Sequence, residues 1–203
     1  NIIVYDEKYI HVWPVHPYDR LVELIKEKKW ENLSIGVEMD SHYYTAYCHQ
    51  KLLHGLPNAK IKDSERLVNW VRLVKSNEEI KFMKIAAEIT QLGMKKAFEV
   101  INPGVRQCDA VAQIYSTLIS GTKDHGGDYS SIVPLLPTGK GTSASHLTWS
   151  DDKFVDGEAS IIEISGAYKK YHCPMARTVL LGKPDQKKID TMKKTREALE
   201  AGI

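Results

Sequence analysis

Apolar and polar residues alternate along the first seventy positions in the pattern of short strands and amphipathic helices. The pattern predicts four segments: strands over 2–5 and 10–13, an amphipathic helix over 17–30 and a buried strand over 33–39. Ser41 is then a candidate N-cap for a helix that Gly55 ends. This order of elements predicts a small α/β domain over residues 1–70.

From Val71 onward the pattern changes to longer helical periods followed by strands. It predicts helices over 77–101 and 107–120, a strand near 132–136, a hairpin over 159–181 with its turn at 166–170, and a helix from about 185 to 203. Ser76 with Glu79 three residues later forms a capping box that begins the first of these helices. The second region, 71–203, therefore reads as an α+β domain.

One charged residue interrupts the apolar strand of the predicted hairpin. Glu163 stands among Ile161, Ile162 and Ile164. Burying an unpaired carboxylate costs several kcal/mol, so such a residue is paired, protonated or functional. A structural carboxylate bonded to Arg177 or to backbone is the alternative, and the residues alone leave both interpretations open.

Composition excludes some classes of function. Acidic and basic residues nearly balance, with a formal net charge of +2, and no Lys/Arg block is interleaved with aromatic residues, so we expect no nucleic-acid partner. No stretch approaches the roughly 20 apolar residues of a membrane span. Three cysteines without a Cys-x-x-Cys pair read as free thiols in a reducing compartment, and we expect a cytoplasmic protein without a membrane partner.

Two motifs resemble those of the pita-bread superfamily of creatinases, Xaa-Pro peptidases and methionine aminopeptidases. Residues 72–80, Arg-Leu-Val-Lys-Ser-Asn-Glu-Glu-Ile, resemble the family's entry into its catalytic domain, and residues 161–178 resemble its metal-binding hairpin. His146, ahead of the strand, falls where the family places its first active-site histidine. The resemblance implies an α+β pita-bread (creatinase-like) catalytic domain, incomplete in this chain, after part of a creatinase-type N-terminal α/β domain.

The hairpin departs from the metallopeptidase pattern at the positions that hold metal. That pattern carries two bridging aspartates eleven residues apart, and here Glu163 falls on the first and Pro174 on the second. Proline has no side-chain oxygen, and two divalent cations held mainly by carboxylate oxygen do not readily survive that loss. The resemblance therefore implies no cofactor, whereas a peptidase would need two divalent cations such as manganese or cobalt.

Within the superfamily the resemblance is strongest to the ectoine hydrolases. The phrases shared with that group include 36–40, 68–72, 125–129 and 171–174, and the group also has glutamate at the position of Glu163. This implies a metal-independent hydrolase that opens a cyclic amidine, with Glu163 as nucleophile or general base and His146 as proton shuttle. The implied substrate-binding residues are Asp128, Tyr168, His172 and Arg177.

Plainer roles compete with several of these assignments. A turn-capping role is common for an aspartate such as Asp128, and Tyr168 and Arg177 can brace the hairpin instead of touching substrate. Two other functions also stay open: a divalent-metal Xaa-Pro peptidase, and a catalytically silent pita-bread module that binds partners. By the same resemblance we expect a homodimer acting on a small cationic molecule.

Overall fold

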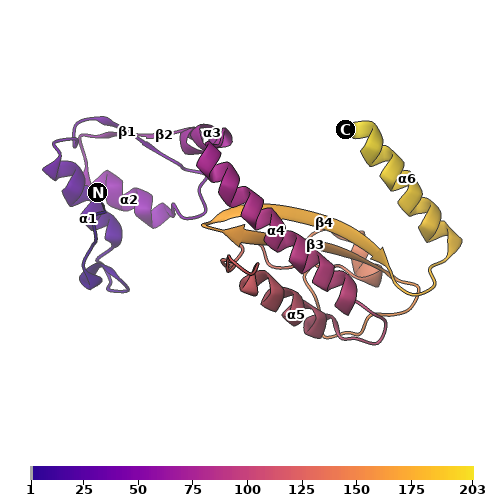
Figure 1. Ribbon diagram of the computed structural model, residues 1–203. Helices are drawn as coiled ribbons and strands as arrows, with labels where there is room; N and C mark the ends of the chain where they lie inside the picture. Colours follow the sequence, from indigo (N-terminus) through magenta and orange to yellow (C-terminus); the bar gives the residue numbers. More distant parts are fainter. Residues whose placement is uncertain (1) are drawn as a thin grey trace. The chain divides into compact units, whose positions relative to one another are not determined.

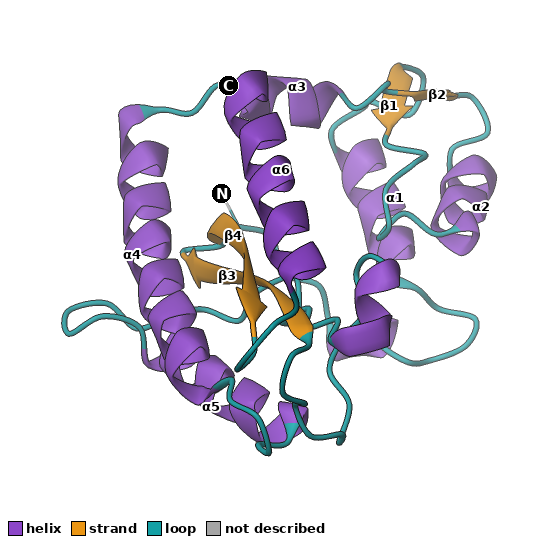
Figure 2. Ribbon diagram, turned by 90° about the vertical axis from the view of Figure 1, so that its right-hand side faces the viewer, coloured by secondary structure: helices purple, strands orange, loops and turns teal. Residues whose placement is uncertain are grey.

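The computed structural model describes residues 2–203, and the chain forms two compact units that divide between Val74 and Lys75. Figure 1 follows the chain by colour from indigo to yellow, and Figure 2 distinguishes helices from strands. Each unit is described by itself below.

The first unit is a small α/β arrangement. Its elements in chain order are the 3-10 helix η1 (Glu7–Tyr9), α1 (Pro17–Glu27), β1 (Ser34–Val37), α2 (Ala46–Gly55), β2 (Lys60–Asp63) and α3 (Leu67–Leu73). The strands β1 and β2 pair in parallel, with Ile35 opposite Ile61. Val22 and Ile25 of α1 pack with Leu52 of α2 and Leu56 in an apolar cluster that holds the two helices together.

Three sequence predictions for this unit are wrong. Segments 2–5 and 10–13 are not strands: the apolar side chains of the first are exposed, and the second bends at His11, which has a φ of 55°. Thr45, and not Ser41, caps α2, because its Oγ1 accepts the backbone N–H of Cys48. The helix predicted over 17–30 and the strand predicted over 33–39 are confirmed with shorter bounds.

The second unit contains the long helices and the hairpin. Its elements are α4 (Asn77–Val100), α5 (Gln107–Ser120), the 3-10 helix η2 (Gly139–Ser143), β3 (Ala159–Tyr168), β4 (Tyr171–Leu180) and α6 (Gln186–Gly202). The predicted capping box is present, since Ser76 Oγ accepts the Glu79 N–H and the Glu79 carboxylate accepts the Ser76 N–H. Figure 1 shows α4 lying across the β3–β4 hairpin.

Both long helices contribute to one apolar core with the hairpin. Ile89 of α4 and Ile114 of α5 pack with Ile162 and Ile164 of β3, and all four are almost completely buried. Even-numbered residues of β3 therefore face the helices, which leaves the odd-numbered ones, Glu163 among them, on the other face.

A third segment lies along the outer edge of β3. Leu135 exchanges both backbone hydrogen bonds with Glu163, the Ile161 N–H donates to the Pro137 carbonyl, and the Asp128 N–H donates to the Ala167 carbonyl. The strand predicted near 132–136 is reduced to the isolated bridge at Leu135. Because β4 bonds the other edge, β3 is held on both sides.

The hairpin turns later than predicted. Tyr168 pairs with Tyr171, so the turn consists of Lys169 and Lys170, with φ of 50° and 67°. Two left-handed residues match the twist of a two-residue hairpin connection. Gly166, which we placed in the turn, lies within β3 instead.

Gly166 is needed where α4 approaches the hairpin. A Cβ at this position would lie 2.6 Å from the Ala86 carbonyl oxygen and 2.7 Å from the Thr90 backbone nitrogen. The buried Thr90 hydroxyl accepts the Gly166 N–H at 2.8 Å and lies 2.6 Å from the Cys173 carbonyl oxygen. Helix and hairpin are thus joined by close backbone approach and by a side chain that hydrogen-bonds both strands.

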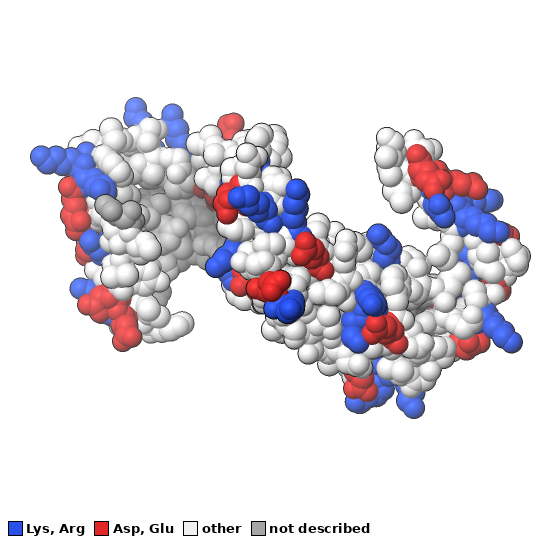
Figure 3. All heavy atoms as spheres, viewed as in Figure 1, with Lys and Arg blue, Asp and Glu red and all other residues white. Residues whose placement is uncertain are grey.

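The surface of α4 carries both acidic and basic side chains. Figure 3 shows blue and red side chains interspersed over the visible surface, and the ion pairs of α4 include Lys81 with Glu78 and Lys96 with Glu99. Over residues 2–203, no helix is long and apolar enough to cross a membrane.

Candidate active site

Glu163 is held rigidly in the middle of β3. Its backbone bonds Leu135 on one side, its neighbours Ile162 and Ile164 are buried in the core, and its cross-strand partner on β4 is Ala176. The side chain of Glu163 is 30% exposed on the face away from α4 and α5. Because Ala176 is small, it does not cover the Glu163 carboxylate, and the paired backbone of β3 fixes the position of this side chain.

His146 approaches this carboxylate from a loop. The loop follows η2, and His146 has a φ of 61°, in the left-handed region that few residues other than glycine adopt. Such strained conformations cluster at functional sites. The ring Nε2 lies 3.8 Å from Glu163 Oε2, with the histidine side chain 72% exposed.

The pair has the makeup of an acid–base site. At 3.8 Å the two groups are beyond direct hydrogen-bond distance but close enough for a proton carrier between them. Imidazole and carboxylate side chains are common general acids and bases. The structure therefore brings together the two catalytic residues that the sequence singled out, whose roles stay predictions.

The side chains on the face of Glu163 show whether this hairpin could bind two metal ions. In the β3–β4 register Ser165 pairs with Pro174, so position 174 lies diagonally across from Glu163 on one face. A carboxylate there would stand near that of Glu163, but proline offers no oxygen. Among the described residues no group of three or more His, Cys, Asp or Glu side chains could hold a metal ion. The donors that this chain brings to the face are the carboxylate of Glu163 and the imidazoles of His146 and His172. With one carboxylate they do not fit a two-metal centre.

His172 shares the face of Glu163 and lies towards the hairpin turn. It pairs with Ala167, and its Nε2 accepts the backbone N–H of Ser131 at 3.0 Å, while its Nδ1 lies 3.1 Å from the Lys170 carbonyl oxygen. Both ring nitrogens are therefore engaged by backbone groups.

Asp128 is placed at the hairpin turn. Its Oδ2 accepts the backbone N–H of Lys170 at 3.1 Å and lies 3.8 Å from the Lys170 ammonium group. That ammonium lies over the ring of Tyr129, 4.0 Å from its centroid. This is the turn-capping arrangement that competed with the substrate-binding role.

Tyr168 and Arg177 lie on the opposite face of the hairpin from Glu163. Tyr168 packs edge-on against Phe82 of α4, with ring centroids 5.9 Å apart. Arg177 pairs with Ile162, and its Nη1 donates to the carbonyl of Ala176 at 2.7 Å. Both contacts brace the hairpin, and the substrate-binding roles given to these residues stay predictions.

A strong electrostatic anchor joins the hairpin to the start of α4. The Tyr171 hydroxyl donates to Glu79 Oε1 at 2.7 Å, and the Ser76 N–H donates to Glu79 Oε2 at 2.7 Å. The backbone hydrogen bond from Ser76, followed by that from Tyr171, lowers the pKa of Glu79 from 4.5 to about 2. Tyr171 thus lies on the helix side, and His172 on the side of Glu163.

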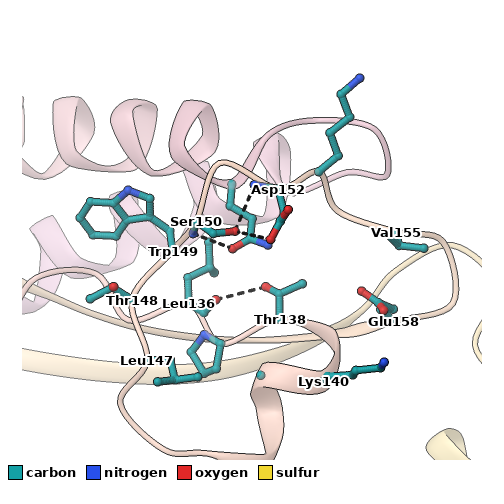
Figure 4. Close-up of a pocket in the computed structure, with 14 residues that line it drawn as sticks. Leu136, Thr138, Lys140, Leu147, Thr148, Trp149, Ser150, Asp152, Val155 and Glu158 are labelled. Carbon is teal, nitrogen blue, oxygen red and sulfur yellow. Dashed lines mark hydrogen bonds between the residues drawn. The ribbon is translucent and has the colours of Figure 1, made fainter.

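A separate hollow of about 840 Å³ lies beside the loop that carries His146 (Figure 4). Its polar groups bond one another: the Ser150 hydroxyl donates to Asp152, and the Ser150 N–H donates to Gln107 Oε1. Leu147 and Trp149 line it, whereas Glu163 does not. The hydrogen bonds of Ser150 stabilise the loop beside this hollow. The hollow is not part of the candidate site.

Sequence reasoning missed the residues that set the surroundings of Glu163. The Thr90 hydroxyl on α4 hydrogen-bonds both strands, and the Ser131 backbone N–H donates to His172. No local pattern marks either residue, because each depends on a partner more than forty positions away. The phrase around Gly126 and Gly127 marked the loop of Ser131, but not the residue itself.

Comparison with known proteins places the chain in a family. The model of metallopeptidase family M24 matches residues 81–203, which is more than half of the chain. The chain belongs to metallopeptidase family M24. Its fold is accordingly the pita-bread-like α+β fold of that family, as the two sequence motifs predicted.

Two curated relatives match the chain from end to end. Ectoine hydrolase from Halomonas elongata is 40% identical over 209 residues, covering 100% of this chain and 52% of the relative. An uncharacterized hydrolase/peptidase from Sinorhizobium fredii is 39% identical and also covers 100% of this chain and 52% of the relative. The chain spans about half the length of the curated relatives it matches.

Comparison with solved structures agrees on the fold. Prolidase from Thermococcus sibiricus has a TM-score of 0.80 and is 20% identical, covering 99% of this chain and 52% of that one. At that identity the likeness concerns the fold alone, and it includes the hairpin that carries Glu163.

Proposed function

We propose that the protein hydrolyses a cyclic amidine such as ectoine, opening one carbon–nitrogen bond of the ring without a metal ion. The observation that carries this proposal is the pairing of Ser165 with Pro174 on the face of Glu163, where a metallopeptidase needs a second carboxylate. The 40% identity to an ectoine hydrolase along the whole chain supports the substrate class.

The charge of the substrate suits the residues that remain. A protonated amidine is a delocalised cation with N–H donors, and the Glu163 carboxylate can accept charge-assisted hydrogen bonds from it. The carboxylate is 30% exposed on a strand bonded on both edges, so its position changes little when a ligand enters. A cationic substrate thereby takes the place that metal ions have in the peptidases.

In the general-base route, Glu163 takes a proton from a water molecule that adds to the amidine carbon. The ring carbon–nitrogen bond then breaks, the carbon becomes that of an amide, and His146 gives a proton to the departing nitrogen. The products are one amine and one amide in a single open chain. The Nε2–Oε2 distance of 3.8 Å allows the proton taken by Glu163 to return to His146 through one water.

In the nucleophilic route, the Glu163 carboxylate itself adds to the amidine carbon, and the ring carbon–nitrogen bond breaks as His146 gives a proton to the departing nitrogen. Water then cleaves the new bond between the carboxylate oxygen and this carbon, which frees Glu163 and leaves the same amine and amide. Both routes use the same two residues in the same places. Mass spectrometry after acid quenching separates them, because only the nucleophilic route leaves a substrate-derived adduct on the peptide that contains Glu163.

The test combines metal analysis of the purified protein with an NMR assay of ectoine. We expect well under one metal ion per chain and conversion of ectoine to acetyl-diaminobutyrate that resists a chelator. A parallel assay with Xaa-Pro dipeptides serves as the comparison and should show no cleavage.

Two results would contradict the proposal. Nearly two metal ions per chain with cleavage of Xaa-Pro dipeptides and no turnover of ectoine would establish the peptidase function. No metal and no turnover of either substrate would favour a module that binds partners without catalysis.

A further inference from the structure

His172 bridges the face of the hairpin on which Glu163 lies. It stands on β4 opposite Ala167 of β3, and its ring reaches the backbone of Ser131 in the segment beyond the far edge of β3. Ala167 is 1% exposed, and its small side chain lets the imidazole pass over the strand. The bridge therefore joins β4 directly to the segment that runs on to Leu135.

The bridge lies at one end of the candidate site. Ala167 is four residues from Glu163 along β3, or roughly 13 Å at about 3.3 Å per residue. The segment that receives His172 is fixed at Asp128, which bonds the Ala167 carbonyl, and at Leu135, which bonds Glu163. Between these two points, the His172 ring accepts the Ser131 N–H. The ring therefore helps to position residues 128–135 at the edge of the face on which Glu163 lies.

The two hydrogen bonds fix the protonation of the ring. The Lys170 carbonyl can only accept, so Nδ1 carries the hydrogen, and the Ser131 N–H can only donate, so Nε2 is unprotonated. We propose that neutral His172 is a positioning residue, which holds the segment around Ser131 at the border of the face of Glu163 and releases it when the imidazole is protonated. The effect on substrate binding rests on the proposed function, whereas the effect on the segment does not.

Protonation of His172 changes the group of Ser131 that its Nε2 can hydrogen-bond, from the backbone N–H to the side-chain hydroxyl. A proton on Nε2 would point at the Ser131 N–H, and the backbone bond would be lost. The Ser131 hydroxyl, 3.3 Å from Nε2, can accept from the protonated ring, but this leaves the Ser131 backbone N–H without its acceptor. A change of pH that protonates the ring therefore tests this exchange.

The charged and titratable groups around the ring come from two elements. Lys169 and Lys170 belong to the turn, while Asp128 and Tyr129 belong to the segment beyond β3. Asp128 already receives the Lys170 N–H and lies 3.8 Å from its ammonium group. Neither of these contacts uses a nitrogen of His172, so the exchange at Ser131 can be separated from them.

Glutamine offers a matched variant, because its Oε1 can occupy the position of Nε2 and accept the Ser131 N–H without titrating. Leucine removes the acceptor. The experiment measures the amide exchange protection factor of the peptide containing Ser131 in the purified protein at pH 7.5 and pH 5.5, for wild type, His172→Gln and His172→Leu. Thermal unfolding of each variant reports whether the fold is retained.

We expect the wild-type protection factor of this peptide to fall about tenfold at pH 5.5, the size expected for one lost hydrogen bond. His172→Gln should keep the high value at both pH values, and His172→Leu the low value at both. In the ectoine assay, the KM of the wild type should rise at low pH, and that of His172→Gln should rise less, whereas kcat should change with pH to the same extent in both.

The proposal would be overturned by equal protection in wild type and His172→Leu at pH 7.5, or by the same loss with pH in wild type and His172→Gln. If the leucine variant does not fold, the proposal is still tested by comparing how the protection factor of the Ser131 peptide changes with pH in wild type and in His172→Gln. Failure of the protein to turn over ectoine would overturn the proposed function, but not the exchange result.

Discussion

The contact between α4 and the hairpin predicts a large effect from adding one methyl group, in Gly166→Ala. The new Cβ would lie 2.6 Å from the Ala86 carbonyl oxygen, where ordinary contact begins at 3.4 Å, so helix and strand must separate by about 0.8 Å. The other close atoms are the Thr90 backbone nitrogen at 2.7 Å and Ile89 Cβ at 2.9 Å. No side-chain rotation relieves a clash with backbone.

Overpacking of this kind costs about 1–3 kcal/mol, and we expect the upper part of that range because the contacts are rigid. With a urea dependence of about 2 kcal/mol per molar, a loss of about 3 kcal/mol lowers the unfolding midpoint by about 1.5 M. Urea unfolding followed by circular dichroism measures the shift.

Gly126→Ala is the matched control, because no atom lies within 4 Å of the Cβ it would add. This variant should keep the wild-type free energy of unfolding within about 0.5 kcal/mol. If Gly166→Ala also stayed within 0.5 kcal/mol, the close approach of α4 to β3 would be refuted.

Two further predictions concern the same helix. Thr90→Val removes the hydroxyl that bonds Gly166 and Cys173 and should lower the free energy of unfolding by about 1–3 kcal/mol, measured by thermal unfolding. Thr90→Ser keeps a hydroxyl and should cost less. Equal losses in the two variants would contradict the role of the Thr90 hydroxyl in joining α4 to the hairpin. Because its pKa is lowered from 4.5 to about 2, Glu79 stabilises the fold above pH 4.5 and loses this effect as the pH falls towards 2. Urea unfolding of Glu79→Gln should therefore depend less on pH across that window, and an unchanged dependence would count against the anchor.

Long elements with local signals could be predicted from the sequence. The capping box at Ser76 and the helical periods fixed α4 and α5 to within a residue, because caps and periodicity act over a few positions. The strand β2 was missed, since Lys60–Asp63 is charged and mostly exposed and so lacks an apolar pattern.

Elements that depend on distant partners could not be predicted in this way. Gly166 was assigned to the turn because glycine commonly marks turns, whereas its small size serves the approach of α4. Lys169 and Lys170 form the turn without a typical turn sequence, with Asp128 bonding the second of them.

The candidate site was predictable in part. Glu163 stood out as a charge in an apolar strand, and the family resemblance pointed to His146. Its approach to within 3.8 Å depends on a left-handed backbone in a loop, which no residue pattern shows. The bond from Ser131 to His172 joins residues 41 positions apart and became visible only in the fold.

The most direct test of the account is the turnover of ectoine by Glu163→Gln, measured by NMR beside wild type and the control Glu88→Gln. Glu88 is exposed on α4 and carries the same charge outside the site. The account predicts that Glu163→Gln loses about 10²–10⁴-fold in kcat with its fold retained, while Glu88→Gln matches wild type. Near-wild-type turnover by Glu163→Gln would contradict the central role of this carboxylate.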